Sequence, residues 1–284
     1  MNEEKSQDIL RAWSESAAYW DRNRDVIRSM FEPITAALLG EAGVSEGSSV
    51  LDVAGGTGQP AIAIAELVGP SGEVVCTDAV AEMVRAADEE ARRLGLRNIS
   101  FRQCPADSLP FRDNEFDLSV SRLGLMFFPD PVASLKEMLR VTKPGGRVAL
   151  AVWGGREFNP YFRIVSEVMS RYIEPEPEEP DAPGAFRFEY PGAVSNLLGR
   201  AGAREVVERE FDFYIEAPVT LKDFWRVRSE MSDTLREKIG RLSGEEVSRA
   251  AQEVSAAMSK YFPDGRMKIP ARVIIAAGAK AASE

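Results

Sequence analysis

Apolar residues recur at helical spacing near the start of the chain and predict two helices before any strand. The apolar face of the first helix consists of Ile9, Leu10, Trp13, Ala17 and Trp20. The second helix is predicted to run from about Arg24 to Leu39 and to end at Gly40. These helices place residues 1–45 in a separate helical segment.

From residue 48 the pattern changes to short β-rich runs that alternate with amphipathic helical runs. Strands are predicted at SSVLDV (48–53), EVVCTD (73–78), ISFRQC (99–104), FDLSVS (116–121) and GRVALAVW (146–153). Helices are predicted at PAIAIAELV (60–68), AEMVRAADEEARRLG (81–95) and PVASLKEMLRVT (131–142), the last of which KPGG would end. Asp130 is expected at the N-terminus of that helix. This alternation predicts that residues 46–153 form a parallel, doubly wound α/β sheet.

The regular alternation stops after Trp153. Residues 154–200 are expected to form a cap or linker whose Pro- and acid-rich stretch, 173–183, is an exposed loop or the hinge of a lid. Residues 201–284 would complete the sheet with an antiparallel edge hairpin, interrupted by a helical insertion at about 218–262. The remaining predicted elements are a helix at 191–202 and strands at 204–215 and 271–279. The insertion contains KDFWRVR (222–228), interpreted as an amphipathic helix start whose positive charges face solvent rather than form an anion site.

The composition excludes several classes of chemistry. The chain has 284 residues and no histidine, so a Ser-His-Asp triad, a Cys-His pair and a histidine-ligated metal are impossible. Its 35 basic and 45 acidic residues give a net charge of −10, which disfavours nucleic acid as a partner. Cys76 and Cys104 are too few for a disulfide framework or a thiolate metal site and are interpreted as small buried apolar residues. No metal is expected.

The termini and the apolar runs suggest neither secretion nor a membrane span. The chain begins with the acidic, polar sequence MNEEKSQDIL, which lacks the basic-then-apolar order of a signal peptide. No apolar run approaches the roughly 18 residues needed to cross a bilayer. We therefore expect a cytoplasmic protein.

A glycine-rich turn after the first strand of the sheet is the main candidate for ligand binding. Gly55, Gly56 and Gly58 follow this strand, where residues without Cβ let a ligand approach the backbone at a helix N-terminus. Asp78 ends the next strand, twenty residues after Gly58, where a carboxylate can accept hydrogen bonds from both ribose hydroxyls. This order of elements predicts a nucleoside-containing cofactor at the carboxyl ends of parallel strands.

Two kinds of cofactor are compatible with this turn. Residues 56–61 satisfy the G-x-G-x-x-A form of the dinucleotide fingerprint, which would make the protein an NAD(P)-dependent oxidoreductase or epimerase. Against this, Asp52 beside the turn suits an ammonium group better than a pyrophosphate, and Pro60 removes a backbone N–H that phosphate binding would use. Asp107 could instead accept a hydrogen bond from an adenine amino group. The chain also lacks an evident Tyr-x-x-x-Lys pair.

Five consecutive segments resemble signature blocks of class I S-adenosylmethionine-dependent methyltransferases, in particular the branch of ubiquinone/menaquinone-biosynthesis enzymes and many small-molecule methyltransferases. They are VLDVAGGTG, the Asp of VVCTDAV, PADSLPF, FDLSVSRLGLMFFPDP and VTKPGGRVALAVW. The resemblance implies a Rossmann-like, seven-stranded, mostly parallel sheet with helical cap insertions, residues 1–45 as a lid, and S-adenosyl-L-methionine as the cofactor. One departure is Ala54, where the family usually has glycine. Its methyl group is acceptable if φ stays negative.

The resemblance also assigns residues to the cofactor. Asp52 and the Ala54–Gly58 turn would face its methionyl end and ribose, and Asp78 would hold the ribose hydroxyls. The other implied contacts are Ala79 or Val80 beside the adenine, Ala106 and Asp107 at the adenine edge, Ser121 and Arg122 along the methionyl side, and Tyr19 or Trp20 from the lid. For Tyr19 and Trp20 the alternative is that both aromatic rings pack the helix on the core.

Methyl transfer suits a chain without imidazole, because a sulfonium leaving group needs mainly in-line positioning and exclusion of water. Aromatic and apolar residues beyond the fourth and fifth strands favour a lipophilic or aromatic small-molecule acceptor. Arg122 is the candidate orienting or catalytic group, and no general base can be named. The predicted substrate contacts are Arg122, Met126, Phe127, Trp153, Phe158 and Tyr161. A homodimer is compatible with the sequence, as is a non-catalytic cofactor-binding protein of the same fold.

Overall fold

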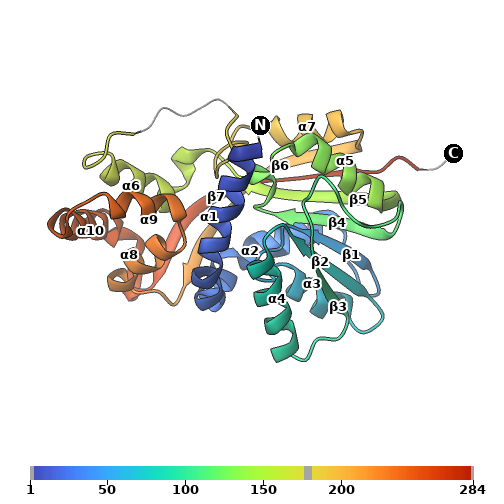
Figure 1. The fold of residues 1–284 in the computed structure, drawn as a ribbon, viewed down its shortest axis with the longest axis horizontal. Helices are drawn as coiled ribbons and strands as arrows, with labels where there is room; N and C mark the ends of the chain where they lie inside the picture. Colours follow the sequence, from blue (N-terminus) through green and yellow to red (C-terminus); the bar gives the residue numbers. More distant parts are fainter. Residues whose placement is uncertain (1–2, 176–180, 283–284) are drawn as a thin grey trace.

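A single seven-stranded sheet in the order β3-β2-β1-β4-β5-β7-β6 forms the centre of the protein (Figure 1). The computed structural model describes residues 3–175 and 181–282, with residues 3–6 as backbone only. β1 to β5 pair in parallel, whereas β7 runs antiparallel to both β5 and β6. The strands are β1 (Ser49–Val53), β2 (Glu73–Asp78), β3 (Ile99–Gln103), β4 (Phe116–Arg122), β5 (Thr142–Trp153), β6 (Arg204–Ala217) and β7 (Met267–Ala279). The predicted fold, a mostly parallel sheet with an antiparallel edge hairpin, is confirmed.

Helices cover this sheet and extend beyond one end of it. The helices that follow the strands of the core are α3 (Ala61–Val68), α4 (Ala81–Arg93), α5 (Pro131–Val141) and α7 (Ala193–Ala201). Two helices precede the sheet, α1 (Glu3–Arg22) and α2 (Arg24–Ala42). The helices of the cap are α6 (Pro160–Met169), α8 (Leu221–Glu230), α9 (Asp233–Gly240) and α10 (Gly244–Met258). Single 3-10 turns are η1 (Leu125–Phe127), η2 (Arg156–Phe158), η3 (Ser259–Tyr261) and η4 (Pro263–Gly265).

The arrangement of these helices sets where a ligand can enter. Figure 1 shows α6, α8, α9 and α10 gathered at one end of the molecule. α2 packs against β4, β5, β7 and β6, and α1 contacts α4 on one side and α8 and α9 on the other. α1 therefore bridges the sheet core and the cap.

One apolar core runs through all four predicted segments of the chain, from Ile27 in α2 to Ala277 in β7. Cys76 and Cys104 are free thiols buried in it, as predicted. The boundaries of the four segments remain a prediction. No described helix is long and apolar enough to cross a membrane.

α2 ends later than predicted. It continues through Gly40 to Ala42, and Gly43 ends it in the left-handed conformation at φ 79°. The Gly43 N–H donates to the carbonyl groups of Leu39 and Gly40, which satisfies the free carbonyls of the last turn. A glycine inside the last turn costs a helix little stability, whereas the left-handed conformation that follows the last turn requires a glycine. Gly43, and not Gly40, therefore ends α2.

Two further differences concern residues 142–169. The KPGG segment (143–146) is part of β5 and lies in the register shift between the Phe116–Thr142 and Leu118–Arg147 pairs of β4 and β5, and α5 ends just before it at Val141. α6 lies where the sequence pattern was taken to be irregular. Pro160 opens it at the first position, and its buried face consists of Tyr161, Ile164, Val165, Val168 and Met169. Of the predicted loop at 173–183, residues 176–180 lie outside the described residues.

Candidate active site

A cavity of about 360 Å³ opens at the carboxyl ends of β1, β2 and β4. Its floor is the glycine turn after β1 and the ends of β2 and β4, and one wall consists of residues 104–107. The opposite wall comes from α1 and α2, and η1 and the first turns of α5 complete the lining. This is the place where open α/β sheets bind ligands, and the volume lies in the range of small-molecule sites.

The glycine turn leaves space only on its cavity side. A Cβ on Gly55 would lie 2.4 Å from the Cys76 Sγ atom and 2.5 Å from Asp52 Oδ2, so this residue must be glycine for the turn to rest on the strands. Gly56 has φ 57°, and a Cβ there would have no heavy atom within 4 Å. Gly58 packs against Ile62 and Ala87 instead of lining the cavity.

Ala54 departs from the sequence-based expectation. Its φ is +59°, in the left-handed region, and not negative as the tolerance of its methyl group was taken to require. The methyl group fits because Gly124 faces it, since a Cβ on Gly124 would lie 2.7 Å from the Ala54 Cβ atom. Ala54 thus keeps the strained conformation for which glycine is better suited.

Asp78 lies at the end of β2 and lines the cavity. Its Oδ2 accepts a hydrogen bond from the Gly56 N–H at 3.0 Å, and its Oδ1 accepts one from the Val80 N–H at 2.9 Å. Burial raises the pKa of Asp78 above its usual value, while these backbone N–H groups oppose the shift. The carboxylate is therefore held rigidly between the glycine turn and the start of α4.

Asp52 lies beneath the turn and is fully buried. Its Oδ2 accepts the N–H of Ala61 at 3.1 Å, whereas its Oδ1 has no hydrogen-bond partner among the described residues. Burial raises the pKa of Asp52 to about 7, and the positive charge of Arg122 opposes this shift. The Ser121 hydroxyl is also buried without a partner.

Arg122, the last residue of β4, is the only described cation that lines the cavity. Its Nη1 donates to Thr35 Oγ1 at 2.7 Å and its Nη2 donates to the Gln59 carbonyl at 3.1 Å, whereas Nε has no partner. The guanidinium also lies 5.6 Å from the centre of the Phe31 ring. Burial lowers the pKa of Arg122 to about 10, so the side chain stays charged at neutral pH.

The two aromatic lid candidates point in different directions. Trp20 lines the cavity with Trp13, and their rings meet edge to face with centres 5.5 Å apart. Trp13 also meets Phe127 edge to face, at 5.1 Å. Tyr19 does not line the cavity, because its ring lies under the guanidinium of Arg236 in α9, at 4.6 Å.

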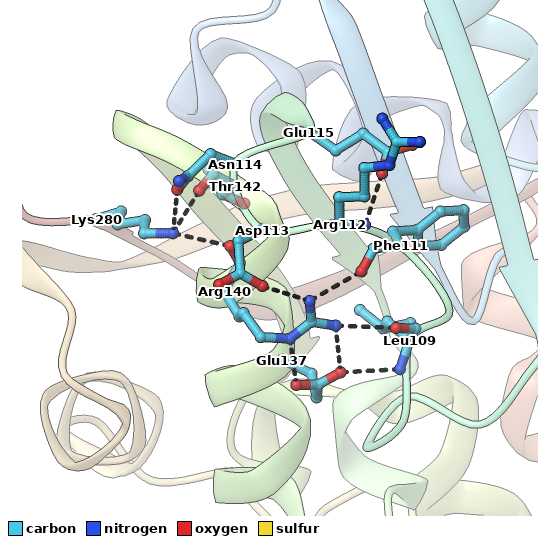
Figure 2. A network of polar contacts seen from close by, with 10 residues as sticks. All are labelled: Leu109, Phe111, Arg112, Asp113, Asn114, Glu115, Glu137, Arg140, Thr142 and Lys280. Carbon is cyan, nitrogen blue, oxygen red and sulfur yellow. Dashed lines mark hydrogen bonds and ion pairs between the residues drawn. The ribbon is translucent and has the colours of Figure 1, made fainter.

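A network of polar contacts holds residues 109–115 against α5 (Figure 2). This segment directly follows Ala106 and Asp107, both of which line the cavity. Arg140 of α5 donates to the carbonyl groups of Leu109 and Phe111 at 2.9 and 2.8 Å. Glu137 accepts from the Leu109 N–H at 3.0 Å and pairs with Arg140 at 2.7 Å. The segment that follows the predicted adenine edge is therefore anchored to α5.

Several predicted substrate contacts lie outside the cavity. Met126 and Trp153 are buried neighbours, with the Trp153 N–H donating to the Met126 Sδ atom at 3.5 Å. Tyr161 is buried in the cap, and Phe158 is 44% exposed with Arg272 over its ring. Arg122 and Phe127 do line the cavity. Asp130 has the predicted structural role, since its carboxylate accepts the Ala133 N–H at 2.9 Å as the N-cap of α5.

Much of the apolar wall was not predicted from the sequence. Ile9, Leu10 and Trp13 were recognised as a helix face but not as a lining, and Phe31 of α2 was not singled out. The signal for the first three was the apolar stripe itself, which is continuous with Trp20. The other missed lining residues include Ile27, Gln59 and Pro105, whereas Leu123 and Phe128, which the sequence placed in the apolar acceptor region, do line the cavity.

The cavity fits a ligand that combines a ribose, an adenine and a positively charged tail. Asp78 is positioned for a ribose diol, and the open side of Gly56 admits a ligand close to the backbone. The unpartnered Oδ1 of Asp52 lies beneath the turn, where the side chain carries a negative charge above its pKa of about 7. S-adenosylmethionine carries all three groups. Among the described residues, no cluster of three or more Asp, Glu or Cys side chains could hold a metal ion.

Comparison with known proteins identifies relatives of the chain. A family described as a methyltransferase domain matches residues 44–170. Demethylmenaquinone methyltransferase from Geobacillus kaustophilus is 30% identical over 227 residues, which cover 76% of this chain and 97% of that protein. The YcgJ protein of Bacillus subtilis superimposes with a TM-score of 0.56 at 18% identity, over 88% of this chain and 98% of that one. The [4+2]-cyclase SpnF superimposes with a TM-score of 0.57 at 18% identity, over 95% and 97% of the two chains, and these two structures show the shared fold.

Proposed function

The chain belongs to the family of S-adenosylmethionine-dependent methyltransferases that includes the demethylmenaquinone methyltransferases, and from this premise we propose that it methylates a lipophilic phenol or hydroquinone. The observation that carries the proposal is the make-up of the cavity. One wall is apolar and aromatic, and among the described residues the buried guanidinium of Arg122 is the only cation in the lining.

Several residues would hold the cofactor. Asp78 would accept hydrogen bonds from the ribose hydroxyls, and the backbone around Gly56 would lie against the ligand. Ala79 and Val80 would flank the adenine, with Asp107 at its edge. Asp52 and Ser121 would act from beneath the turn, where their unpartnered oxygen atoms favour a positive charge above them. When bound, S-adenosylmethionine supplies an electrophilic methyl group.

The ionisable side chains in the lining limit the acceptor. Among the described residues they are Asp78, Asp107, Cys104 and Arg122. The two carboxylates are committed to the cofactor side, and burial raises the pKa of the Cys104 thiol to about 11, so it stays protonated. An aliphatic hydroxyl, which needs a strong base, would not react here. A phenol or hydroquinone can lose its proton to solvent before it binds and enter the site as the phenolate.

Arg122 would orient and stabilise such an acceptor. Arg122 lines the cavity, its guanidinium is fixed by Thr35 and Gln59, and its buried Nε–H has no partner among the described residues. A phenolate oxygen could accept this N–H, and the charge-assisted bond would hold the ring above the methyl group. Trp13, Trp20 and Phe31 would exclude water from the reacting atoms.

Transfer of a labelled methyl group tests the proposal. Purified protein is incubated with methyl-labelled S-adenosylmethionine and a panel of lipophilic hydroquinones, phenols, aliphatic alcohols and amines. We expect label in the phenols and hydroquinones and none in the alcohols. Arg122→Met should lower kcat/KM by roughly 10–100-fold, the scale of a lost hydrogen bond to a charged group. Arg85→Met, on the exposed face of α4, is the matched control.

The panel also separates the alternatives. Binding of S-adenosylhomocysteine without label in any acceptor class would favour a cofactor-binding protein that does not transfer methyl groups. Such a role is compatible with the fold, because a fold does not determine the chemistry of its site. Label in the amines alone would overturn the assignment of the acceptor class and leave the cofactor assignment intact.

A further inference from the structure

Thr35, in the middle of α2, is a buried residue that connects this helix to Arg122. It is 7% exposed and is not among the described residues that line the cavity. Its hydroxyl donates to the Phe31 carbonyl, one helical turn earlier, at 3.1 Å and accepts from Arg122 Nη1 at 2.7 Å. A hydroxyl has a single proton, so the bond to Phe31 commits this proton and leaves the oxygen lone pairs for the guanidinium.

Three contacts fix the guanidinium of Arg122. Thr35 holds Nη1, the Gln59 carbonyl holds Nη2 at 3.1 Å, and the centre of the Phe31 ring lies 5.6 Å from the guanidinium carbon. Because Phe31 and Thr35 are four residues apart, they lie on the same face of α2. Two of the three contacts therefore come from one helix face, and α2 largely sets where the charge of Arg122 lies.

Asp52 is the opposite charge that attracts this guanidinium. Both side chains are buried, and the positive charge of Arg122 opposes the rise in the pKa of Asp52. Even so, the two groups do not bond to each other, because Asp52 Oδ1 and Arg122 Nε both lack a partner and their other polar atoms bond elsewhere. Opposite charges attract strongly where water is excluded, so other contacts are needed to hold these two apart.

We propose that Thr35 is a positioning residue that holds Arg122 away from Asp52, so that each buried charge stays available for a different ligand. Asp52 is then free for the ammonium group of the cofactor and Arg122 for the oxyanion of the acceptor. A direct ion pair between the two side chains would neutralise both and use up their unpartnered polar atoms. The inference rests on the proposed function, because that function brings these two ligand groups into the cavity.

The remaining groups around Asp52 leave Arg122 as the described cation that acts on it. Cys76 Sγ lies 4.0 Å from Asp52 Oδ2, but burial raises the pKa of this thiol well above its usual value, so it stays neutral. The negative charge of Asp78 raises the pKa of Asp52, and the Ala61 N–H lowers it. The pKa of Asp52 therefore reports how close the guanidinium lies.

The pH dependence of S-adenosylhomocysteine binding tests the proposal by calorimetry. Thr35→Val keeps the shape of the side chain but removes the oxygen, so Arg122 loses an anchor and moves towards Asp52. The pKa of Asp52 then falls, and the rise in affinity of about tenfold expected between pH 6 and pH 8 should disappear. Affinity at pH 8 should be about tenfold below that of the unmodified protein, because Arg122 now neutralises the carboxylate. Thr35→Ala should behave in the same way, and Thr35→Ser should restore the profile.

Arg122→Met distinguishes positioning from loss of the cation. Without the positive charge the pKa of Asp52 rises further, so the increase in affinity should move to higher pH, opposite to the effect of Thr35→Val. If Thr35 only supported the fold and Arg122 left the site in its absence, Thr35→Val would show the same upward movement and the proposal would be wrong. Thr142→Val is the matched control, because this buried threonine also donates to the carbonyl four residues earlier, at 2.7 Å, and has no bond to Arg122.

Carbon-13 NMR of the Asp52 carboxyl group in the ligand-free protein is a second measurement. The midpoint of its titration should lie near 7 in the unmodified protein and in Thr142→Val, lower in Thr35→Val and higher in Arg122→Met. An unchanged midpoint in Thr35→Val would overturn the positioning role, whatever the binding data show. Failure to bind S-adenosylhomocysteine, with the midpoints shifted as expected, would instead overturn the proposed function and leave the separation of the two charges intact.

Discussion

Burial brings the pKa of Asp52 close to neutral pH. Its pKa is raised to about 7 by burial, so the side chain is neutral below pH 7 and a carboxylate above it. The α-ammonium group of S-adenosylhomocysteine stays protonated over this range and would gain an opposite charge beneath the turn. We expect the affinity to rise by about tenfold between pH 6 and pH 8, as calorimetry would measure.

Two controls isolate this effect. Asp52→Asn should flatten the pH profile, and 5′-methylthioadenosine, which lacks the amino-acid portion, should bind with no dependence on pH. Because the folded-state pKa lies above the ordinary value of 3.8, Asp52 also makes the empty protein less stable as pH rises from about 4 to 7. A pH profile that is unchanged in Asp52→Asn would show that another group causes it.

The side chains that fit at positions 54 and 124 depend on each other, because Ala54 and Gly124 face one another. A methyl group added at Gly124 would lie 2.7 Å from the Ala54 Cβ atom and 2.8 Å from the Ser121 Oγ atom. Gly124→Ala should therefore cost about 1–3 kcal/mol of unfolding free energy, measured by urea denaturation. Ala54→Gly removes one of the two clashes and relieves a left-handed alanine, so the double variant should recover part of that loss. Strictly additive effects would contradict the contact.

At the residue scale, the sequence predicted positions correctly where backbone geometry dictates the residue type. Gly55, Gly56 and Asp78 line the cavity at the ends of β1 and β2, whereas the hydrogen bonds of Asp78 to a ribose stay a prediction. The positive φ of Ala54 could not be foreseen, since alanine gives no sign of it. Arg228 of α8 is only 7% exposed, although its charge was expected to face solvent. Its burial was missed because charge is normally a sign of exposure, and only the cap packed around it reveals the exception.

Helix α1 is held by the cap as well as by the sheet core. Arg236 of α9 donates to Ser16 Oγ at 2.6 Å and lies over the Tyr19 ring. The Asn23 amide, just after α1, donates to Glu230 Oε2 at 2.9 Å. Arg236→Ala should therefore speed hydrogen exchange across residues 7–22, because α1 would open more often without these contacts.

Looser attachment of α1 should also weaken cofactor binding, since Trp13 and Trp20 on that helix line the cavity. The apparent Kd for S-adenosylhomocysteine should rise several-fold, because binding requires α1 to lie over the cavity and a smaller fraction of the variant has α1 in that position. Arg249→Ala, at an exposed arginine of the cap, is the matched control. Exchange that is faster throughout the cap, and not in α1, would mean that Arg236 stabilises the cap alone.

At the scale of elements, the regular βαβ alternation could be predicted from the sequence, but the ends of the helices and the packing of the cap could not. Gly43 and not Gly40 ends α2, because the left-handed turn and not the glycine itself stops a helix. α6 was not predicted because it follows a Gly-rich turn and precedes a Pro-rich stretch, although its buried residues recur at helical spacing. The placement of α1 against α9 depends on contacts more than 200 positions apart in the sequence, which no local pattern encodes.

In the whole molecule, the sheet order brings the last strand into the interior. β7 lies between β5 and β6, so the residues at 267–279 share the core with those at 142–153. The apolar run at 271–279 correctly predicted this strand and its hairpin, because a strand buried on both faces must be apolar. Where the helical insertion would pack could not be predicted, since its apolar faces fit more than one position.

Ligand-linked stability tests the cofactor assignment on the intact protein. The cavity is lined by α1, α2, the glycine turn and the ends of β2 and β4, so a ligand there contacts parts of the fold that must separate on unfolding. A ligand at 100 times its Kd stabilises the folded state by about 2.7 kcal/mol. For a chain of this size that corresponds to a rise in Tm of roughly 5 °C. We expect this rise with S-adenosylhomocysteine and none with NADH in differential scanning fluorimetry. A rise with NADH alone would mean that the glycine turn binds a dinucleotide and that the proposed methyl transfer is wrong.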